Sequence, residues 1–281
     1  MDVPISDILT FFSAPFLTCL ILAGIHCYLG FHVLERGVIF VDLSLAQIAA
    51  FGSTIALLLG FEKDSASSYF IALGCTFAAA WIFTLGRRYE KTLPQEGLIG
   101  VTYALGSAAV ILCVDSLAHG SEHVKSLLVG QILWVQWPDL LTISLIYGAI
   151  AFIHFKFKKQ FFAASQGKLG SKQGLWDFIF YALFGIVITS SVKVAGVLQV
   201  FSYLIVPSLI ANMCFAGKSL KLRLIFGWIL SFALSLIGLI WSYSQDLPTG
   251  AAIVVCFTLI PVILVVLLTI RQKLQSIRQA Q

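Results

Sequence analysis

A carboxylate and a carboxamide interrupt an apolar run near the start of this sequence. The run follows the charge pair Glu35-Arg36 and continues to Gly60, with Asp42 as its one acidic residue and Gln47 as its one amide. A charged side chain inside a membrane-length segment is expensive, so it usually faces a cavity, a partner or an ion path. We therefore predict that Asp42 lines an ion path. The alternative is a structural ion pair between Asp42 and Arg36.

Two more side chains extend this candidate metal site. Gln47 lies five residues after Asp42, which at 3.6 residues per turn is a different helical face, so the two need not share one ion. Asp246 is the only charged residue between residues 224 and 270 and lies in a turn at residues 244–250. We expect Asp246 either to cap the amino terminus of the next helix or to guard the outer entrance of the path.

A third group of candidate metal ligands is His119, Glu122 and His123. They match the H-x-x-E-H pattern of some metalloproteases, but the Gly and Ser between them favour a short loop over a helix. A protease site is therefore disfavoured. Imidazole and carboxylate still suit zinc, manganese or iron, so these residues remain candidate metal contacts on the outer face. The alternative is a hydrated loop or a contact for another protein.

The sequence carries no ATP-binding motif. The tetrapeptide 216–219, Ala-Gly-Lys-Ser, resembles the end of a phosphate-binding loop, but Asn212 stands where that motif needs glycine. We therefore expect the protein not to be an enzyme, and any ATP hydrolysis that powers it to occur in a separate chain.

The composition indicates a membrane protein. Of 281 residues, 59% are hydrophobic and only 11% are charged, against about 25% charged in an ordinary soluble chain. Continuous apolar runs without strand-like alternation indicate transmembrane helices rather than a β-barrel. We predict an all-α integral membrane protein, a polytopic bundle of eight or nine transmembrane helices in a single domain over residues 1–281.

The predicted spans each contain roughly 20 mostly apolar residues. They are 8–31, 37–60, 69–86, 97–116, 138–155, 176–192, 194–213, 224–243 and 250–270. If the sixth and seventh, which meet near Lys193, form one broken element, the count is eight.

The positive charges predict the orientation. Fifteen of the 18 Lys and Arg residues fall in five clusters, which nine spans place in the cytoplasm when the amino terminus is outside. The carboxyl terminus is then cytoplasmic. The clusters are Arg36; Arg87, Arg88 and Lys91; Lys156, Lys158, Lys159, Lys168 and Lys172; Lys218, Lys221 and Arg223; and Arg271, Lys273 and Arg278.

Two connecting segments between the predicted spans have a predicted structure or role. Residues 127–137 are too short to cross and carry two tryptophans, so we expect a short helix at the outer face. The basic, glycine-punctuated segment 156–174 is the longest cytoplasmic connection. It is either a solvated linker or a short helix that docks a soluble partner.

Several stretches, taken together and in order, resemble the ABC-type metal-ion importer permeases of the zinc, manganese and iron group. The resemblance covers roughly residues 20–270. It rests on the span-two stretch 35–52, Glu96-Gly97-Leu98-Ile99-Gly100, Leu127-Leu128-Val129-Gly130-Gln131-Ile132-Leu133, Val194-Ala195-Gly196-Val197-Leu198 with Ile205-Val206-Pro207, and Asp246-Leu247-Pro248-Thr249-Gly250.

The resemblance implies a site as well as a fold. The family's span-two carboxylate and histidine line the metal path. Asp42 matches the carboxylate, whereas the histidine position falls on Ala46 when counted from Asp42 and on Gln47 when counted back from Gly52. The chain lacks that imidazole. An amide oxygen in its place favours manganese or iron over zinc.

The resemblance also implies partners. They are a cytoplasmic ATP-binding subunit docked on residues 157–174, an extracytoplasmic metal-binding protein, and a second permease subunit, identical or related, with no nucleic acid. The function implied is ATP-driven import of a divalent transition-metal cation (manganese, zinc or iron) across a bacterial inner membrane. The metal is the transported substrate, and no cofactor is bound permanently. The alternatives are a permease for iron chelates or cobalamin-like solutes, and a proton-driven secondary transporter.

Overall fold

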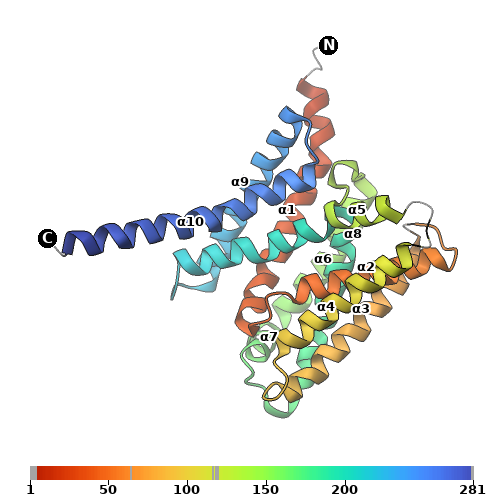
Figure 1. Ribbon diagram of the computed structural model, residues 1–281, viewed down its shortest axis with the longest axis horizontal. Coiled ribbons are helices and arrows are strands. Elements are labelled where there is room, and N and C mark those ends of the chain that lie inside the picture. Colours follow the sequence, from red (N-terminus) through yellow and green to blue (C-terminus); the bar gives the residue numbers. More distant parts are fainter. Residues whose placement is uncertain (1–4, 64, 116, 118–119, 280–281) are drawn as a thin grey trace.

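The computed structural model describes residues 5–63, 65–115, 117 and 120–279, and of residues 5–10, 120–121, 123 and 273–279 only the helical backbone. The described part consists of helices and their connections, without a strand (Figure 1). The α-helices are α1 Ile5–Arg36, α2 Val41–Leu58, α3 Ala66–Gly86, α4 Gln95–Val114, α5 Gly120–Val129, α6 Trp137–Lys156, α7 Lys158–Ser165, α8 Gln173–Cys214, α9 Leu220–Gln245 and α10 Thr249–Gln279. Short 3-10 turns are η1 Arg87–Tyr89, η2 Ile132–Trp134 and η3 Gly170–Lys172.

The long helices coincide with the apolar runs. Within the described residues, eight helices are long and apolar enough to cross a membrane, with mean hydropathies from 1.5 to 3.1. Helices satisfy every backbone group internally, which is why apolar runs of this length fold this way in lipid. The predicted all-α membrane bundle is confirmed.

Helix α8 contains both the sixth and the seventh predicted spans. At 42 residues it rises about 63 Å, twice the thickness of a bilayer core, so it is long enough for two crossings. No loop follows Lys193. The break lies at Gly196, whose φ of 77° and ψ of 162° are not helical, and the two halves of α8 run in different directions.

The bend in α8 is tied to the end of α5. The backbone N–H of Gln131 donates to the carbonyl of Val194 at 2.9 Å. Gly130 has a φ of 71°, and a Cβ on Gly196 would fall 2.6 Å from the carbonyl carbon of Val129. Two glycines are therefore required where these backbones cross, because a side chain on either would strike main-chain atoms.

The outer segment before α6 differs from its prediction in two ways. Residues 127–137 are not one short helix: α5 ends at Val129, η2 follows, and α6 begins at Trp137. The stretch containing Glu122 and His123 is not a loop, because α5 begins at Gly120. The left-handed φ of Gly130 ends α5 and redirects the chain along α8.

The packing separates a protein core from a lipid-facing surface. α2 packs against α3 and α4, while α1 packs against α8 (Figure 1). α10 projects from the rest of the bundle. Large apolar side chains stay exposed on α4, α6 and α10, as expected when the solvent is hydrocarbon. Examples are Val101, Leu105, Leu112, Leu141, Leu145, Phe152, Phe155, Val262 and Val265.

The crossing at Gly196 can be tested by adding one methyl group. Gly196→Ala combines a left-handed backbone with a main-chain clash, so we expect a loss of about 1–3 kcal/mol or more in stability. The measurement is the thermal midpoint of the purified protein in detergent. Gly148→Ala in α6, where a Cβ would meet nothing within 4 Å, is the matched control. Equal midpoints for the two variants would contradict the role of the crossing.

Candidate functional site

Asp42 lies in the first turn of α2, where the chain leaves the tight turn after α1. Gly37, with a φ of 69°, ends α1, and α2 begins at Val41. The Asp42 residue is 1% exposed, and neither carboxylate oxygen has a hydrogen-bond partner. A buried carboxylate without a partner is destabilising by several kcal/mol, so this side chain must either take up a proton or meet a cation.

The surroundings of Asp42 offset its charge only in part. The backbone N–H groups of Asp42 and Leu43 interact with the carboxylate without forming a hydrogen bond of good geometry. The amino terminus of a helix favours an anion by about 0.3–2 kcal/mol, which is less than the cost of burial. The carboxylate therefore still lacks a full counter-charge.

A second carboxylate lies near Asp42. Glu96, in the first turn of α4, accepts a hydrogen bond from the backbone N–H of Phe40 at 3.2 Å through Oε1. Its Oε2 is buried without a partner. Two neighbouring carboxyl groups disfavour each other's ionised form, so Asp42 and Glu96 together favour the uptake of a proton or a cation between α2 and α4. The sequence prediction did not assign Glu96 a role in the site, because α2 and α4 meet only in the folded chain.

Arg36 does not pair with Asp42. Its Nη1 donates to Asp177 Oδ1 at 2.6 Å, and Arg87 Nη1 donates to the same oxygen at 2.8 Å. The Asp177 side chain is 1% exposed and also accepts from Gln173 Nε2 at 2.9 Å. The alternative that Asp42 is half of an ion pair with Arg36 is therefore wrong. The counter-ion of Arg36 is Asp177.

The ion network joins the helices at one end of the bundle. Arg36 Nε donates to Ser165 Oγ at 3.2 Å, and the guanidinium carbon of Arg36 lies 4.1 Å from the ring centroid of Phe180. Ser165 also forms a hydrogen bond with His32 Nδ1 at 2.9 Å. One cluster therefore connects α1, η1, α7 and α8.

Gln47 lies at the contact between α2 and α4. It is half-buried, and its Cβ would lie 3.1 Å from a Cβ added to Gly106 of α4. Its role as a metal ligand remains a prediction.

The outer candidates do not form a metal cluster in the described residues. His119 lies outside them, the side chain of His123 is not described, and Glu122 is exposed on α5. No group of three or more His, Cys, Asp or Glu side chains within the described residues is placed to hold a metal ion. Metal contact by these three residues remains a prediction.

Asp246 ends α9 rather than opening α10. It is exposed, adopts a left-handed conformation with a φ of 51°, and is the C-cap residue of α9. The polar contacts of this turn come from Ser242, whose Oγ donates to the carbonyl of Leu247 at 2.7 Å and lies 2.6 Å from Thr249 Oγ1. The expected capping role for α10 is therefore not seen, and a role at the entrance remains a prediction.

The family of the chain follows from comparison with known proteins. The family profile described as "ABC 3 transport family" matches residues 9–268. The chain therefore belongs to the ABC 3 transport family. It is a metal-transport permease, a multi-pass membrane subunit rather than an enzyme, and the ATPase is a separate subunit.

The relatives cover most of the chain. A "Probable metal transport system membrane protein" of Chlamydia muridarum is 25% identical over 80% of this chain and 78% of its own length. A "Probable iron transport system membrane protein" of Haemophilus influenzae is 26% identical over 87% and 89%. A "Manganese import system permease protein ScaB" of Streptococcus gordonii is 23% identical over 89% and 88%.

Solved structures share the fold. PsaBC from Streptococcus pneumoniae in complex with Fab superposes with a TM-score of 0.73 and 20% identity, over 90% of this chain and 91% of that chain. A putative metal-chelate type ABC transporter in an inward-facing conformation gives a TM-score of 0.69 and 19% identity, over 94% and 89%. These likenesses confirm the predicted permease fold.

The ion network predicts a large effect for one isosteric change. Asp177→Asn removes the charge shared by two arginines and leaves Arg36, whose side chain is 0% exposed, without a counter-ion. We expect a loss of about 3–5 kcal/mol, seen as a fall of several degrees in the thermal midpoint of the purified protein. Asp115→Asn, at an exposed position, is the control. A midpoint within one degree of wild type would show that the network does not hold these helices together.

Proposed function

We propose that this permease carries a divalent transition-metal cation, and that Asp42 and Glu96 provide oxygen ligands on its path. The observation that supports the proposal best is the burial of Asp42 with both oxygens unpartnered. A cation that stops briefly beside this carboxylate supplies the missing counter-charge. A site without a permanent partner also lets the ion leave, which transport requires.

The ligand chemistry favours manganese or iron over zinc. Carboxylates suit hard divalent cations, whereas zinc prefers imidazole and thiolate. The position that carries histidine in the family motif is Ala46 or Gln47 in this chain. The relatives named for manganese and for iron transport support this choice. In this scheme the metal is cargo, and the permease needs no resident cofactor.

The partners follow from the family's mode of action. We propose a cytoplasmic ATP-binding subunit, an extracytoplasmic metal-binding protein and a second permease subunit, assembled in a bacterial inner membrane. The bias of 15 basic residues toward one side supports an outer amino terminus and a cytoplasmic carboxyl terminus.

The contacts of α7 support a coupling role for the segment 157–174. α7 occupies residues Lys158–Ser165, and Ser165 contacts both His32 and Arg36 of α1. Gln173 bridges the carbonyl of Ala164 and the carboxylate of Asp177. A displacement of α7 by a bound ATPase therefore reaches α1 and α8 through hydrogen bonds rather than through a flexible linker.

The proposed role of Asp42 in the metal path is tested by removing the charge of its side chain. Asp42→Asn keeps the side-chain volume and removes the charge, so we expect uptake of radioactive Mn²⁺ into proteoliposomes of the full transporter to fall about 10–100-fold. Loss of even an indirect metal partner has effects of this size. Glu96→Gln should reduce uptake less, because Glu96 keeps its hydrogen bond from Phe40.

The control for Asp42→Asn is Glu90→Gln, the same kind of change at an exposed position. Each variant is compared at equal amounts of assembled transporter, measured by size-exclusion chromatography. Wild-type uptake by a correctly assembled Asp42→Asn variant would remove this carboxylate from the path.

The coupling segment is tested at its glycines. Gly167 and Gly170 have φ values of 69° and 54°, so alanine at either position strains the connection between α7 and α8. We expect Gly167→Ala and Gly170→Ala to lower metal-stimulated ATP hydrolysis severalfold. Gly174→Ala, at a helical position where the nearest atom to an added Cβ is 3.9 Å away, is the control. Unchanged ATPase stimulation in the first two variants would speak against a coupling role.

A further inference from the structure

An apolar groove lies on the surface of the bundle between α6 and α9. Both helices pack against α1, which forms the floor of the groove, and α7 contributes side chains at one end. The groove volume is about 540 Å³, within the range of about 300–1,000 Å³ that is typical of sites for small organic molecules. Its apolar lining includes Ile21, Ile25, Phe155, Phe162, Leu220 and Leu224.

Two glycines keep the groove open. Gly24 of α1 and Gly148 of α6 both line it, and a Cβ added to either glycine would meet nothing within 4 Å. The space above these positions is therefore not filled by a neighbouring helix. A larger side chain at either position would project into the groove.

The polar side chains on the wall are bonded within the protein. Ser144 Oγ donates to the carbonyl of Leu140 at 2.6 Å, and Trp228 Nε1 donates to the carbonyl of Gly24 at 3.0 Å. The Tyr147 hydroxyl donates to a backbone carbonyl of α8 at 3.3 Å. Among the described residues that line the groove there is no Asp or Glu. Such a wall suits hydrocarbon better than a hydrated solute or a metal ion.

The length of the groove matches one leaflet of a bilayer. The lining runs from Ser144 to His154 on α6, about 15 Å, and from Leu220 to Trp228 on α9, about 12 Å. One leaflet contributes about 15 Å to the hydrocarbon core. Phe155 and Trp228 are 72% and 44% exposed, so the groove is open to lipid along its side.

Positive charge gathers at the α7 end of the groove. Lys158, the first residue of α7, lines this end and is exposed. Lys156 at the end of α6 and Lys221 in the first turn of α9 are exposed at the same end. Glu35, near the end of α1, does not line the groove and accepts from Gln166 Nε2 at 3.0 Å. Basic side chains at the mouth of an apolar groove favour an anionic lipid headgroup.

We infer that this groove binds an anionic phospholipid of the leaflet on the α7 side, with one acyl chain along α1 and the phosphate beside Lys158. In the proposed orientation this is the cytoplasmic leaflet, where basic groups between helices meet anionic headgroups. The lipid contacts α1, α6, α7 and α9 together. It therefore holds α7, which lies in the proposed docking segment for the ATPase, against the bundle.

Lipid binding tests the headgroup position. The permease in complex with its ATP-binding partner is delipidated in detergent, and phosphatidylglycerol or phosphatidylcholine of the same chain length is added back. Native mass spectrometry counts the bound lipids. We expect wild type to prefer phosphatidylglycerol, and Lys158→Gln to bind it about fivefold more weakly, because one lysine at a membrane surface attracts an anionic lipid by about that factor. Lys91→Gln, at an exposed position outside the groove, should bind like wild type.

A larger side chain at residue 148 tests the position of the acyl chain. Gly148→Leu should weaken binding of both lipids at least about tenfold, because excluding two methylene groups from the groove costs about that factor. Added phosphatidylglycerol should also raise the thermal midpoint of wild type but not of this variant. The control is Gly74→Leu in α3, an exposed glycine outside the groove where an added Cβ also meets nothing within 4 Å.

Three results would overturn the inference. The first is that wild type shows no preference for phosphatidylglycerol, or that the preference survives in Lys158→Gln. The second is that Gly148→Leu binds both lipids like wild type. The third is that the variants change the number of permease copies in the complex while lipid binding is unchanged, which would make the groove an interface between copies.

Two features of the design keep the result interpretable. Lys158→Gln changes an exposed side chain, so it tests the inference even if Gly148→Leu does not fold. The lipid measurements contain no metal. Failure of wild type to take up manganese would therefore count against the proposed transport function alone.

Discussion

The cost of burying charge in a medium without water governs this structure. Asp177 and Asp42 are both 1% exposed, but their environments are opposite. Asp177 accepts from two arginines and a glutamine, so its charge is fully compensated. Asp42 has no such partner. The first carboxylate holds helices together, and the second is the one for which we propose a transported cation as the partner.

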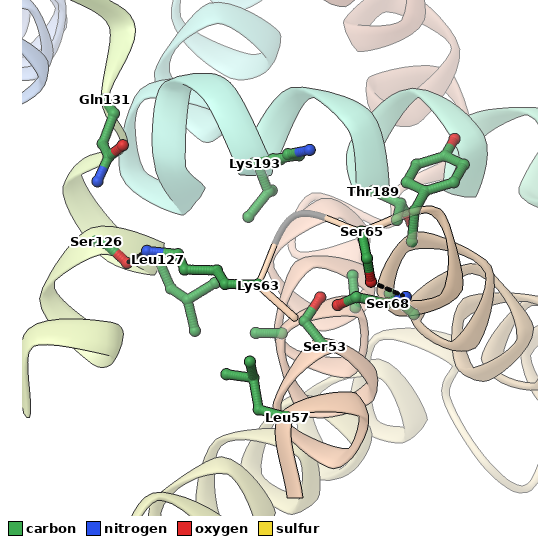
Figure 2. Close-up of a pocket in the computed structure, with 15 residues that line it drawn as sticks. Ser53, Leu57, Lys63, Ser65, Ser68, Ser126, Leu127, Gln131, Thr189 and Lys193 are labelled. Atoms are coloured by element: carbon green, nitrogen blue, oxygen red, sulfur yellow. Dashed lines mark hydrogen bonds between the residues drawn. The ribbon is translucent and has the colours of Figure 1, made fainter. Parts of the chain in front are cut away.

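The two ends of the bundle differ in the polar groups that they contain. At one end, the Asp177 network joins α1, α7 and α8 and includes the short helix of the candidate docking segment. At the other end, a cavity between α2, α3, α5 and α8 is lined by apolar side chains such as Leu57 and Leu127 as well as by lysine and hydroxyl groups (Figure 2). α2 extends between the two regions, with Asp42 in its first turn and Ser53 on the cavity wall.

The bend in α8 sets the relative positions of its two halves and of α5. Gly196 lets the two halves of α8 diverge, and its close crossing with Gly130 anchors α5 beside the cavity. Lys193 lies just before the bend, at the outer end of the first half of α8.

The sequence by itself determined the class, the helices and the isolated carboxylate. In lipid, an apolar run of membrane length satisfies its backbone hydrogen bonds by forming a helix. The helical bundle and the positions of its helices therefore followed from hydrophobicity alone. Asp42 was recognisable because a charge within such a run stands out. The short outer helix was mispredicted, since Gly130 breaks it only in response to α8.

Only the tertiary structure decided which charges meet. Arg36 is six residues from Asp42 in the chain, yet it pairs with Asp177, 141 residues away. Glu96 became a candidate site residue only because the fold places the start of α4 beside the start of α2. Helix periodicity assigns a residue to a face, but which faces pack together depends on the fit of side chains between helices. That fit is a property of the folded chain, and no spacing along the sequence encodes it locally.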